Sequence, residues 1–182
     1  MKALCINLEH RQDRWGAMVK RFEEQGLEVE RVEAVTHLEK WISFNLSQIK
    51  ALSMVSRETV IFEDDVIFTR PFLKDIEPPE GWDGVYFGGN VREDLVRIGD
   101  WWRVKNTWTT HAILYTEKAA KQILKEFDPY SMIYDEWLRT IGQEIMNFYI
   151  QKPYACIQEA GFSDLAGGVT FYDLQMTEIR LI

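Results

Sequence analysis

Cysteine is scarce in this chain of 182 residues, which contains only Cys5 and Cys156. Both lie in short apolar runs, so we expect small buried core residues, with a disulfide between them left open. Two cysteines so far apart do not form a zinc motif. So few cysteines also give no sign of a secreted scaffold held together by disulfides.

Basic residues are outnumbered by acidic ones. The 21 Lys and Arg residues against 29 Asp and Glu residues give a formal net charge of −8. A general nucleic-acid-binding protein needs a basic face to neutralise phosphates, so we expect no nucleic-acid partner. A few local arginines would still suffice for a small ligand that carries phosphate.

Long apolar runs are missing as well. No segment reaches the roughly 18 consecutive apolar residues of a membrane helix. The run at residues 3–6 is shorter than the core of a signal peptide, which takes about 7–15 residues. We therefore expect a cytoplasmic protein without a transmembrane segment, and leave peripheral contact with a membrane open. The composition is typical of a globular protein, and the length predicts a single compact domain over residues 1–182.

Short apolar runs alternate with segments of helical periodicity. We predict strands at residues 3–8, 29–35, 59–62, 66–68, 84–87, 109–115, 148–150 and 154–157, and helices at residues 12–25, 43–56, 117–127 and 133–143. Ser43 is the expected cap of the second helix, and residues 90–107 suit either short strands or a mobile loop. The alternation predicts an α/β layered sheet with flanking helices, in which ligands bind at the carboxyl ends of the strands.

Three consecutive carboxylates, Glu63, Asp64 and Asp65, follow one of the apolar strands. Like charges at a strand end repel one another and cost stability unless a cation offsets them. Hard oxygen ligands of this kind suit Mg²⁺ or Mn²⁺ held together with a diphosphate. A solvated acidic turn explains the same residues equally well.

Two arginines, Arg11 and Arg14, follow the first strand at a spacing of three residues. Together with the amides at the start of the next helix they could face a phosphate. The spacing alone favours ordinary surface charges, with Asp13 paired to Arg14.

An ordered set of motifs resembles glycosyltransferase family 25, the lipooligosaccharide-type galactosyltransferases. The opening Asn7-Leu8-x-x-Arg11-x-x-Arg14 is similar to the start of that family, and residues 61–66 resemble its Glu-Asp-Asp motif, the counterpart of the Asp-x-Asp motif of GT-A enzymes. Further similar segments are the helix around Ser47, residues 82–89, residues 111–115 with 119–121, and Tyr134-Asp135. The resemblance covers about residues 3–165.

The resemblance implies a GT-A-like, Rossmann-like fold and a metal-dependent glycosyltransferase. Such an enzyme would move a sugar, galactose in the first place, from a UDP-sugar or related nucleotide sugar to a saccharide, glycolipid or other hydroxyl acceptor. Asp65, with Asp64 or Glu63, would hold Mn²⁺ or Mg²⁺. The implied donor-binding residues are Asn7, Arg11, Arg14, Asp64, Gly88, Gly89 and His111.

Catalysis with inversion would need a carboxylate to deprotonate the acceptor hydroxyl, and Asp135, with Glu136 second, is the candidate. Each of these assignments has a plainer alternative. Asp135 equally suits a helix N-cap, His111 a structural histidine, and Gly88-Gly89 the end of a strand.

The chain also departs from the family pattern. Family members are usually longer, and residues 44–48 lack the Gly-Cys and Ser-His pairs of the family. The alternatives are a module that keeps a nucleotide-sugar pocket without turnover, and a purely structural protein. Trp101-Trp102 suits an acceptor platform, a lid anchor or a cover for the core, and Ser163-Asp164 suits closure over the donor.

The spacing of the carboxylates fits two phosphoryl-transfer classes poorly. A receiver domain needs an acidic pair directly after the first strand, where this chain has Asn7-Leu8. A haloacid-dehalogenase-type phosphatase needs two aspartates two residues apart, and here the residue two before Asp65 is Glu63.

Overall fold

The computed structural model describes residues 1–92, 95–163, 165 and 167–170. Among these residues, eight strands form one mixed sheet in the order β2-β1-β3-β10-β5-β11-β8-β7. Their bounds are β1 (Lys2–Asn7), β2 (Glu30–Glu33), β3 (Thr59–Glu63), β5 (Gly84–Tyr86), β7 (Val96–Ile98), β8 (Trp101–Arg103), β10 (Ala112–Tyr115) and β11 (Phe148–Gln151). Strands β2, β1 and β3 are parallel, and β10 is antiparallel to both β3 and β5.

Three strand pairs lie outside the large sheet. They are β4 (Val66–Phe68) with β12 (Cys156–Gln158), β6 (Asn90–Val91) with β9 (Thr107–Trp108), and β13 (Gly161–Ser163) with β14 (Gly168–Thr170). The first pair is antiparallel and places Gln158 opposite Val66, directly after the acidic residues. A late segment of the chain is thereby fixed beside the end of β3.

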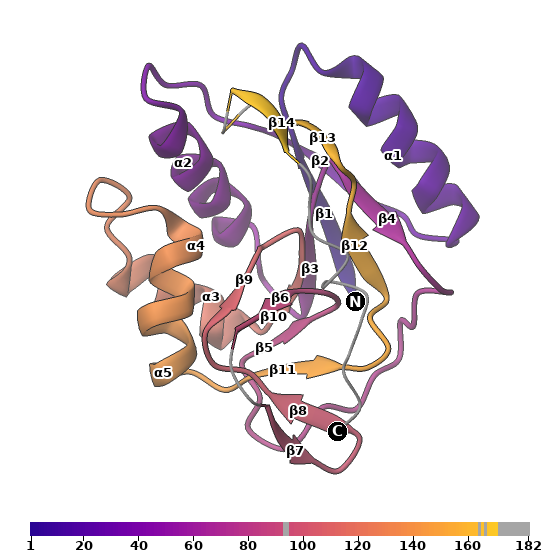
Figure 1. Ribbon diagram of the computed structural model, residues 1–182, viewed down its shortest axis with the longest axis vertical. Coiled ribbons are helices and arrows are strands. Elements are labelled where there is room, and N and C mark those ends of the chain that lie inside the picture. Colours follow the sequence, from indigo (N-terminus) through magenta and orange to yellow (C-terminus); the bar gives the residue numbers. More distant parts are fainter. Residues whose placement is uncertain (93–94, 164, 166, 171–182) are drawn as a thin grey trace.

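Helices cover both faces of the sheet (Figure 1). Helix α1 (Gln12–Glu24) covers one face, where Met18 and Phe22 pack in a cluster with Phe62. The other face is covered by α2 (Lys40–Ser53), α3 (Glu117–Glu126) and α4 (Tyr134–Trp137), followed by a π-helical turn (Leu138–Gly142) and α5 (Gln143–Ile145). Because both faces are covered, the interior strands are apolar without alternation. The predicted α/β layered sheet with flanking helices is confirmed.

Both cysteines, Cys5 and Cys156, are buried free thiols, which confirms that they are core residues. Within the described part of the chain, none of the helices has the length and apolar character needed to cross a membrane.

Several boundaries differ from the expected ones. Helix α2 begins at Lys40 rather than at a Ser43 cap, and the Ser43 hydroxyl accepts a hydrogen bond from the backbone N–H of His37 at 2.7 Å. The strand expected over residues 109–115 is shorter, since β10 begins only at Ala112, and Thr109 has a φ of 77°, which strand geometry does not allow. Residues 90–107, whose sequence suits either short strands or a mobile loop, contain the short strands β6, β7 and β8.

Gly88 provides a test of this packing. A Cβ atom at this position would lie 1.9 Å from the carbonyl oxygen of Cys156 and 2.9 Å from Nε2 of His111. We expect Gly88→Ala to lower the free energy of unfolding by about 2–3 kcal/mol, because neither neighbour is a flexible side-chain end. Urea denaturation measures the change.

The matched control is Gly16→Ala on helix α1, where a Cβ atom has no neighbour within 4 Å. This change should stabilise the protein by roughly 0.5–1 kcal/mol, because alanine favours a helix over glycine. Equal effects of the two substitutions would contradict the close contact at Gly88.

Candidate functional site

A pocket of about 350 Å³ opens at the carboxyl ends of the parallel strands β1, β2 and β3, against helix α2. One part of its wall is apolar and consists of Ile6, Leu8, Ala34, Val35, Phe44 and Leu165. The polar part contains Asn7, Arg14, Gln48, Glu63, Asp64, Asp65 and Gln158, and His10, His37 and Lys40 add to the lining. This is the edge at which open α/β sheets bind ligands, so the site lies where the strand pattern predicts it.

Asp64 is held by two donors within the pocket wall. Its Oδ1 accepts a hydrogen bond from Nη1 of Arg14 at 2.8 Å, and its Oδ2 accepts one from Nδ2 of Asn7 at 2.6 Å. Arg31 in turn donates to Oδ1 of Asn7 at 2.5 Å, so it fixes which way the Asn7 amide faces. Both carboxylate oxygens of Asp64 are thus occupied by protein donors.

Glu63 and Asp65 share one donor, the side-chain amide of Gln158. Its Nε2 lies 3.3 Å from Oε2 of Glu63 and 3.2 Å from Oδ2 of Asp65. The Thr110 hydroxyl donates to Oε1 of Glu63 at 2.6 Å. Burial, reinforced by the charge of Asp64, raises the pKa of Asp65 to about 7. Burial and the charge of Asp65 likewise raise the pKa of Glu63 well above its usual range.

The three carboxylates differ in how well they fit a divalent cation. Within the described residues, no group of three His, Cys, Asp or Glu side chains is placed to hold a metal by itself. Asp64 has both oxygens occupied, whereas Oδ1 of Asp65 is buried without a hydrogen-bond partner among the described residues. Mg²⁺ is commonly bound by one or two carboxylates plus substrate phosphates and water, and Asp65 fits that kind of site.

The two arginines at the start of α1 have different surroundings. Arg14 lines the pocket and pairs with Asp64, while Arg11 forms an ion pair with Asp13 at 2.9 Å. The spacing favours an ion pair between Asp13 and Arg14, but in the structure Asp13 pairs with Arg11. The structure brings Asn7, Arg14 and the acidic residues together, and Arg11 does not line the pocket.

Asp135 lies on α4 and is not among the residues that line the pocket. The N-cap of this helix is Ile133, so the alternative in which Asp135 is the cap is wrong. Oδ1 of Asp135 instead accepts a hydrogen bond from the backbone N–H of Thr109 at 2.9 Å, and burial raises its pKa to about 7. Its charge contributes to the raised pKa of Glu63, so the two groups influence each other electrostatically.

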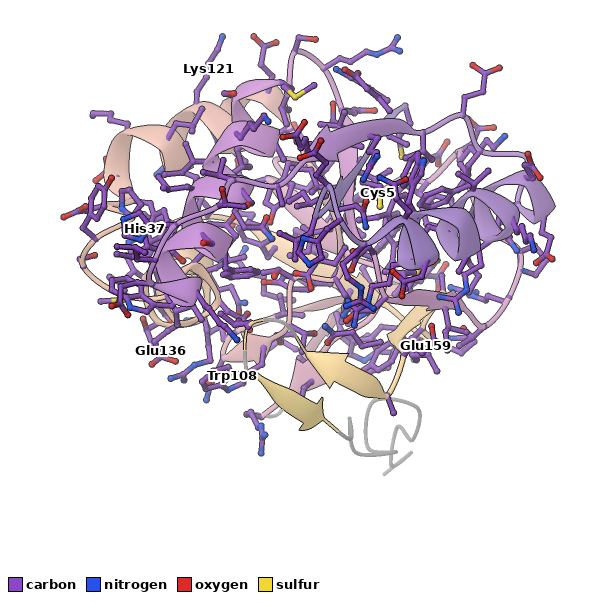
Figure 2. The ribbon with its side chains drawn as sticks, turned by 90° about the horizontal axis from the view of Figure 1, so that it is seen from above. Cys5, His37, Trp108, Lys121, Glu136 and Glu159 are labelled. Carbon is purple, nitrogen blue, oxygen red and sulfur yellow. The ribbon has the colours of Figure 1, made fainter. Side chains whose placement is uncertain are left out.

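Glu136, the second candidate base, pairs with Arg139, which donates to both of its carboxylate oxygens at 3.2 and 2.5 Å. The guanidinium of Arg139 also lies over the ring of Trp108, 4.4 Å from its centroid. Figure 2 shows Glu136 beside Trp108 on one side of the molecule, with Glu159 toward the other. Glu136 is therefore neutralised locally, in contrast to Asp135.

His111 and the glycine pair have structural surroundings. His111 is fully buried, with Nδ1 3.2 Å from the Thr109 hydroxyl, and burial lowers its pKa to about 4, so the ring is neutral near pH 7. At Gly89 a Cβ atom would lie 2.7 Å from Cγ2 of Thr107, and Gly88 is packed against Cys156. Of the implied donor-binding residues, Gly88, Gly89 and His111 do not line the pocket.

The remaining candidates lie outside the pocket wall. Trp101 is buried and donates from Nε1 to the carbonyl of Glu77 at 2.9 Å, which fits a cover for the core. Trp102 lies beside the cationic groups of Arg97 and Lys152. Asp164 and the side chain of Ser163 lie outside the described residues.

Sequence reasoning missed Gln158, Thr110 and Thr109, which provide hydrogen bonds to the buried carboxyl groups. Gln158 follows an apolar strand, as the acidic residues do, and that position was its only signal. Nothing in the sequence marks Thr109 as the donor to Asp135, because its positive φ is a backbone conformation that a β-branched residue rarely adopts.

No protein-family model matches the chain, and no curated protein matches it. Similar solved structures include a Drosophila β-1,4-galactosyltransferase 7 variant in complex with manganese, UDP-Gal and xylobiose (10% identity, TM-score 0.48, 95% of this chain and 71% of that chain). Another is CTP:phosphocholine cytidylyltransferase from Streptococcus pneumoniae (8% identity, TM-score 0.46, 86% of this chain and 92% of that chain). A third is inositol-1-phosphate CTP transferase from T. maritima (16% identity, TM-score 0.41, 83% of this chain and 66% of that chain). These values describe a distant likeness in fold, and membership of glycosyltransferase family 25 stays a prediction.

The partly buried carboxyl of Asp135 predicts a pH dependence of stability. Its pKa in the folded protein is about 7, whereas an unfolded Asp ionises near pH ~3.9. Between these values the folded protein keeps a proton that the unfolded chain has lost, so the contribution of Asp135 to the free energy of unfolding falls as pH rises. The slope is up to about 1.4 kcal/mol per pH unit.

Asp135→Asn removes this contribution while its side-chain oxygen can still accept from Thr109. We expect the variant to gain stability relative to wild type between pH 4 and pH 8, as measured by urea denaturation at both values. Asp100→Asn, at a side chain that is 91% exposed, is the control and should show no such trend. A difference between Asp135→Asn and wild type that does not change with pH would show that Asp135 titrates normally.

Proposed function

We propose that the chain is a metal-dependent glycosyltransferase that binds a nucleotide-sugar donor, such as a UDP-sugar, in the pocket at the ends of β1, β2 and β3. The observation that carries the proposal is the composition of the pocket wall. The wall combines apolar residues with polar ones, and among the polar ones Asp65 keeps one buried oxygen without a partner among the described residues.

The two parts of the wall suit the two parts of such a donor. Leu8, Val35 and Phe44 provide an apolar surface of the kind that packs against a base. Arg14 and Asn7 lie at the polar end, and Arg14 adds a guanidinium that suits phosphate oxygens. Arg14 would then divide its donors between Asp64 and the donor, so Asp64 serves to orient Arg14.

Asp65 is the residue that would hold Mn²⁺ or Mg²⁺. When bound with the donor, the metal would supply a Lewis acid for the leaving nucleoside diphosphate. The protein itself orients the carboxylate through Gln158 and keeps the Asn7 amide turned toward Asp64 through Arg31.

Asp135 is the proposed base for the acceptor hydroxyl, if the reaction inverts the sugar. A base works best when its pKa lies near the operating pH, and burial raises the pKa of Asp135 to about 7. The backbone N–H of Thr109 holds the carboxyl in place. Glu136 is a weaker candidate, because Arg139 occupies both of its oxygens.

A second candidate function is a module that binds a nucleotide sugar without turnover. The hydrogen bonds of Asp64 to Arg14 and Asn7 favour it, because these donors compete with a metal for the lone pairs of Asp64. Turnover with a saccharide or glycolipid acceptor distinguishes the two functions.

Thermal stability with Mn²⁺ and a panel of nucleotide sugars tests the donor site. We expect one class of nucleotide sugar at ~100 times its dissociation constant to stabilise the protein by about 2.7 kcal/mol in the presence of Mn²⁺. The same shift should be lost in Asp65→Asn and kept in Asp75→Asn, a change at an exposed residue. No shift with any nucleotide sugar would overturn the proposal.

The role of Asp135 requires a kinetic measurement. Asp135→Asn should bind the donor as wild type does, because Asp135 does not line the pocket, and should lose about 10²- to 10⁴-fold in turnover. Normal turnover in this variant would rule Asp135 out as the base, and loss of donor binding would indicate a structural role instead.

A further inference from the structure

Gln158 is the last residue of β12 and lies against the acidic turn between β3 and β4. The antiparallel pairing places it opposite Val66. The next residue, Glu159, donates from its backbone N–H to the carbonyl oxygen of Asp65 at 2.7 Å. Backbone contacts on both sides of Gln158 therefore fix its position relative to Asp65.

The amide of Gln158 uses its two ends differently. Its Nε2 donates to Glu63 and Asp65, and its Oε1 is buried without a hydrogen-bond partner among the described residues. The same is true of Oδ1 of Asp65. The two side chains are in direct contact, and both line the pocket. Two acceptors without donors thus occur on neighbouring side chains from different parts of the chain.

Buried acceptors without donors are costly unless an electropositive group reaches them. A buried polar atom without a partner costs roughly 1–3 kcal/mol. An aspartate oxygen and an amide carbonyl oxygen are both hard ligands of Mg²⁺ and Mn²⁺. The pair adds two oxygens without donors among the described residues, beside Asp64, whose oxygens already accept hydrogen bonds from Asn7 and Arg14.

We infer that Gln158 is a metal-binding residue, whose Oε1 and Oδ1 of Asp65 together hold the divalent cation. The inference rests on the proposed function, which requires a metal at Asp65. The remaining positions around the cation would be filled by donor phosphates and water. The same amide would keep Glu63 and Asp65 side by side through its Nε2.

Two substitutions separate a ligand from a residue that only positions the carboxylates. Gln158→Leu removes both the carbonyl oxygen and the amide donor. Gln158→Glu restores an oxygen ligand but no donor, and it adds a negative charge. If Gln158 is a ligand, Gln158→Leu should abolish metal binding and Gln158→Glu should retain it. If Gln158 only positions the carboxylates, both variants should lose metal binding.

The experiment is a titration with Mn²⁺, with and without UDP, in which free Mn²⁺ is followed by electron paramagnetic resonance. We expect the dissociation constant for Mn²⁺ to rise at least about tenfold in Gln158→Leu, as in Asp65→Asn. Gln158→Glu should bind Mn²⁺ at least as tightly as wild type. Gln151→Leu on β11, outside the pocket wall, is the matched control and should not change binding.

A second readout guards against simple unfolding. Without metal, Gln158→Glu should melt at a lower temperature than wild type, because it adds a fourth carboxylate beside Glu63, Asp64 and Asp65. Mn²⁺ should raise its melting temperature by more than it raises that of wild type.

Each other outcome overturns the inference. Wild-type affinity in Gln158→Leu would show that Gln158 is not a ligand. Loss of Mn²⁺ in both variants, with the folded state intact by circular dichroism, would leave Gln158 as a positioning residue. No binding by wild type, with or without UDP, would overturn the metal site of the proposed function as well.

Discussion

Partial burial of the carboxyl groups of Glu63, Asp65 and Asp135 is the constraint on which the candidate site depends. A carboxylate removed from water loses free energy of hydration, and its pKa rises unless donors or cations replace the water. Burial raises the pKa of all three groups. The fold supplies donors to each, through Thr110 and Gln158 and through a backbone N–H, but not enough to satisfy Asp65 fully. The incompletely satisfied carboxyl groups therefore lower the free energy of unfolding of the free protein, and a bound cation would raise it again.

The order of the strands explains how distant residues meet at this turn. Strand β3 lies between β1 and β10, so Asn7 reaches the acidic residues from one side and Thr110 from the other. Strand β12 pairs with β4 and brings Gln158 from the late part of the chain. The apolar wall comes mainly from the ends of β1 and β2 and from α2. The pocket is thus built from several strands and a helix that lie far apart in the sequence, and from no single motif.

The sequence alone located the acidic turn, because an apolar strand that ends in three carboxylates is a local pattern. It also predicted most of the strands and helices, whose periodicity is local too. It could not assign Arg14 to Asp64 or Gln158 to Asp65, because those contacts depend on pairings between segments far apart in the chain. The positive φ of Thr109 was equally out of reach, since tertiary contacts impose it against the preference of the residue. Resemblance carried the prediction of function further than spacing did.

The most direct test of the account is calorimetric titration of the protein with UDP, once with Mn²⁺ and once with the metal removed by EDTA. The pocket wall carries Glu63, Asp64 and Asp65 beside Arg14 and Lys40, and among the described residues Oδ1 of Asp65 has no hydrogen-bond partner. A diphosphate would therefore meet carboxylates whose charge a cation would offset. We therefore predict saturable binding of UDP with Mn²⁺ and binding at least about tenfold weaker without it. Equal affinity under both conditions, or no binding of UDP under either, would contradict a nucleotide-sugar site that depends on a metal at Asp65.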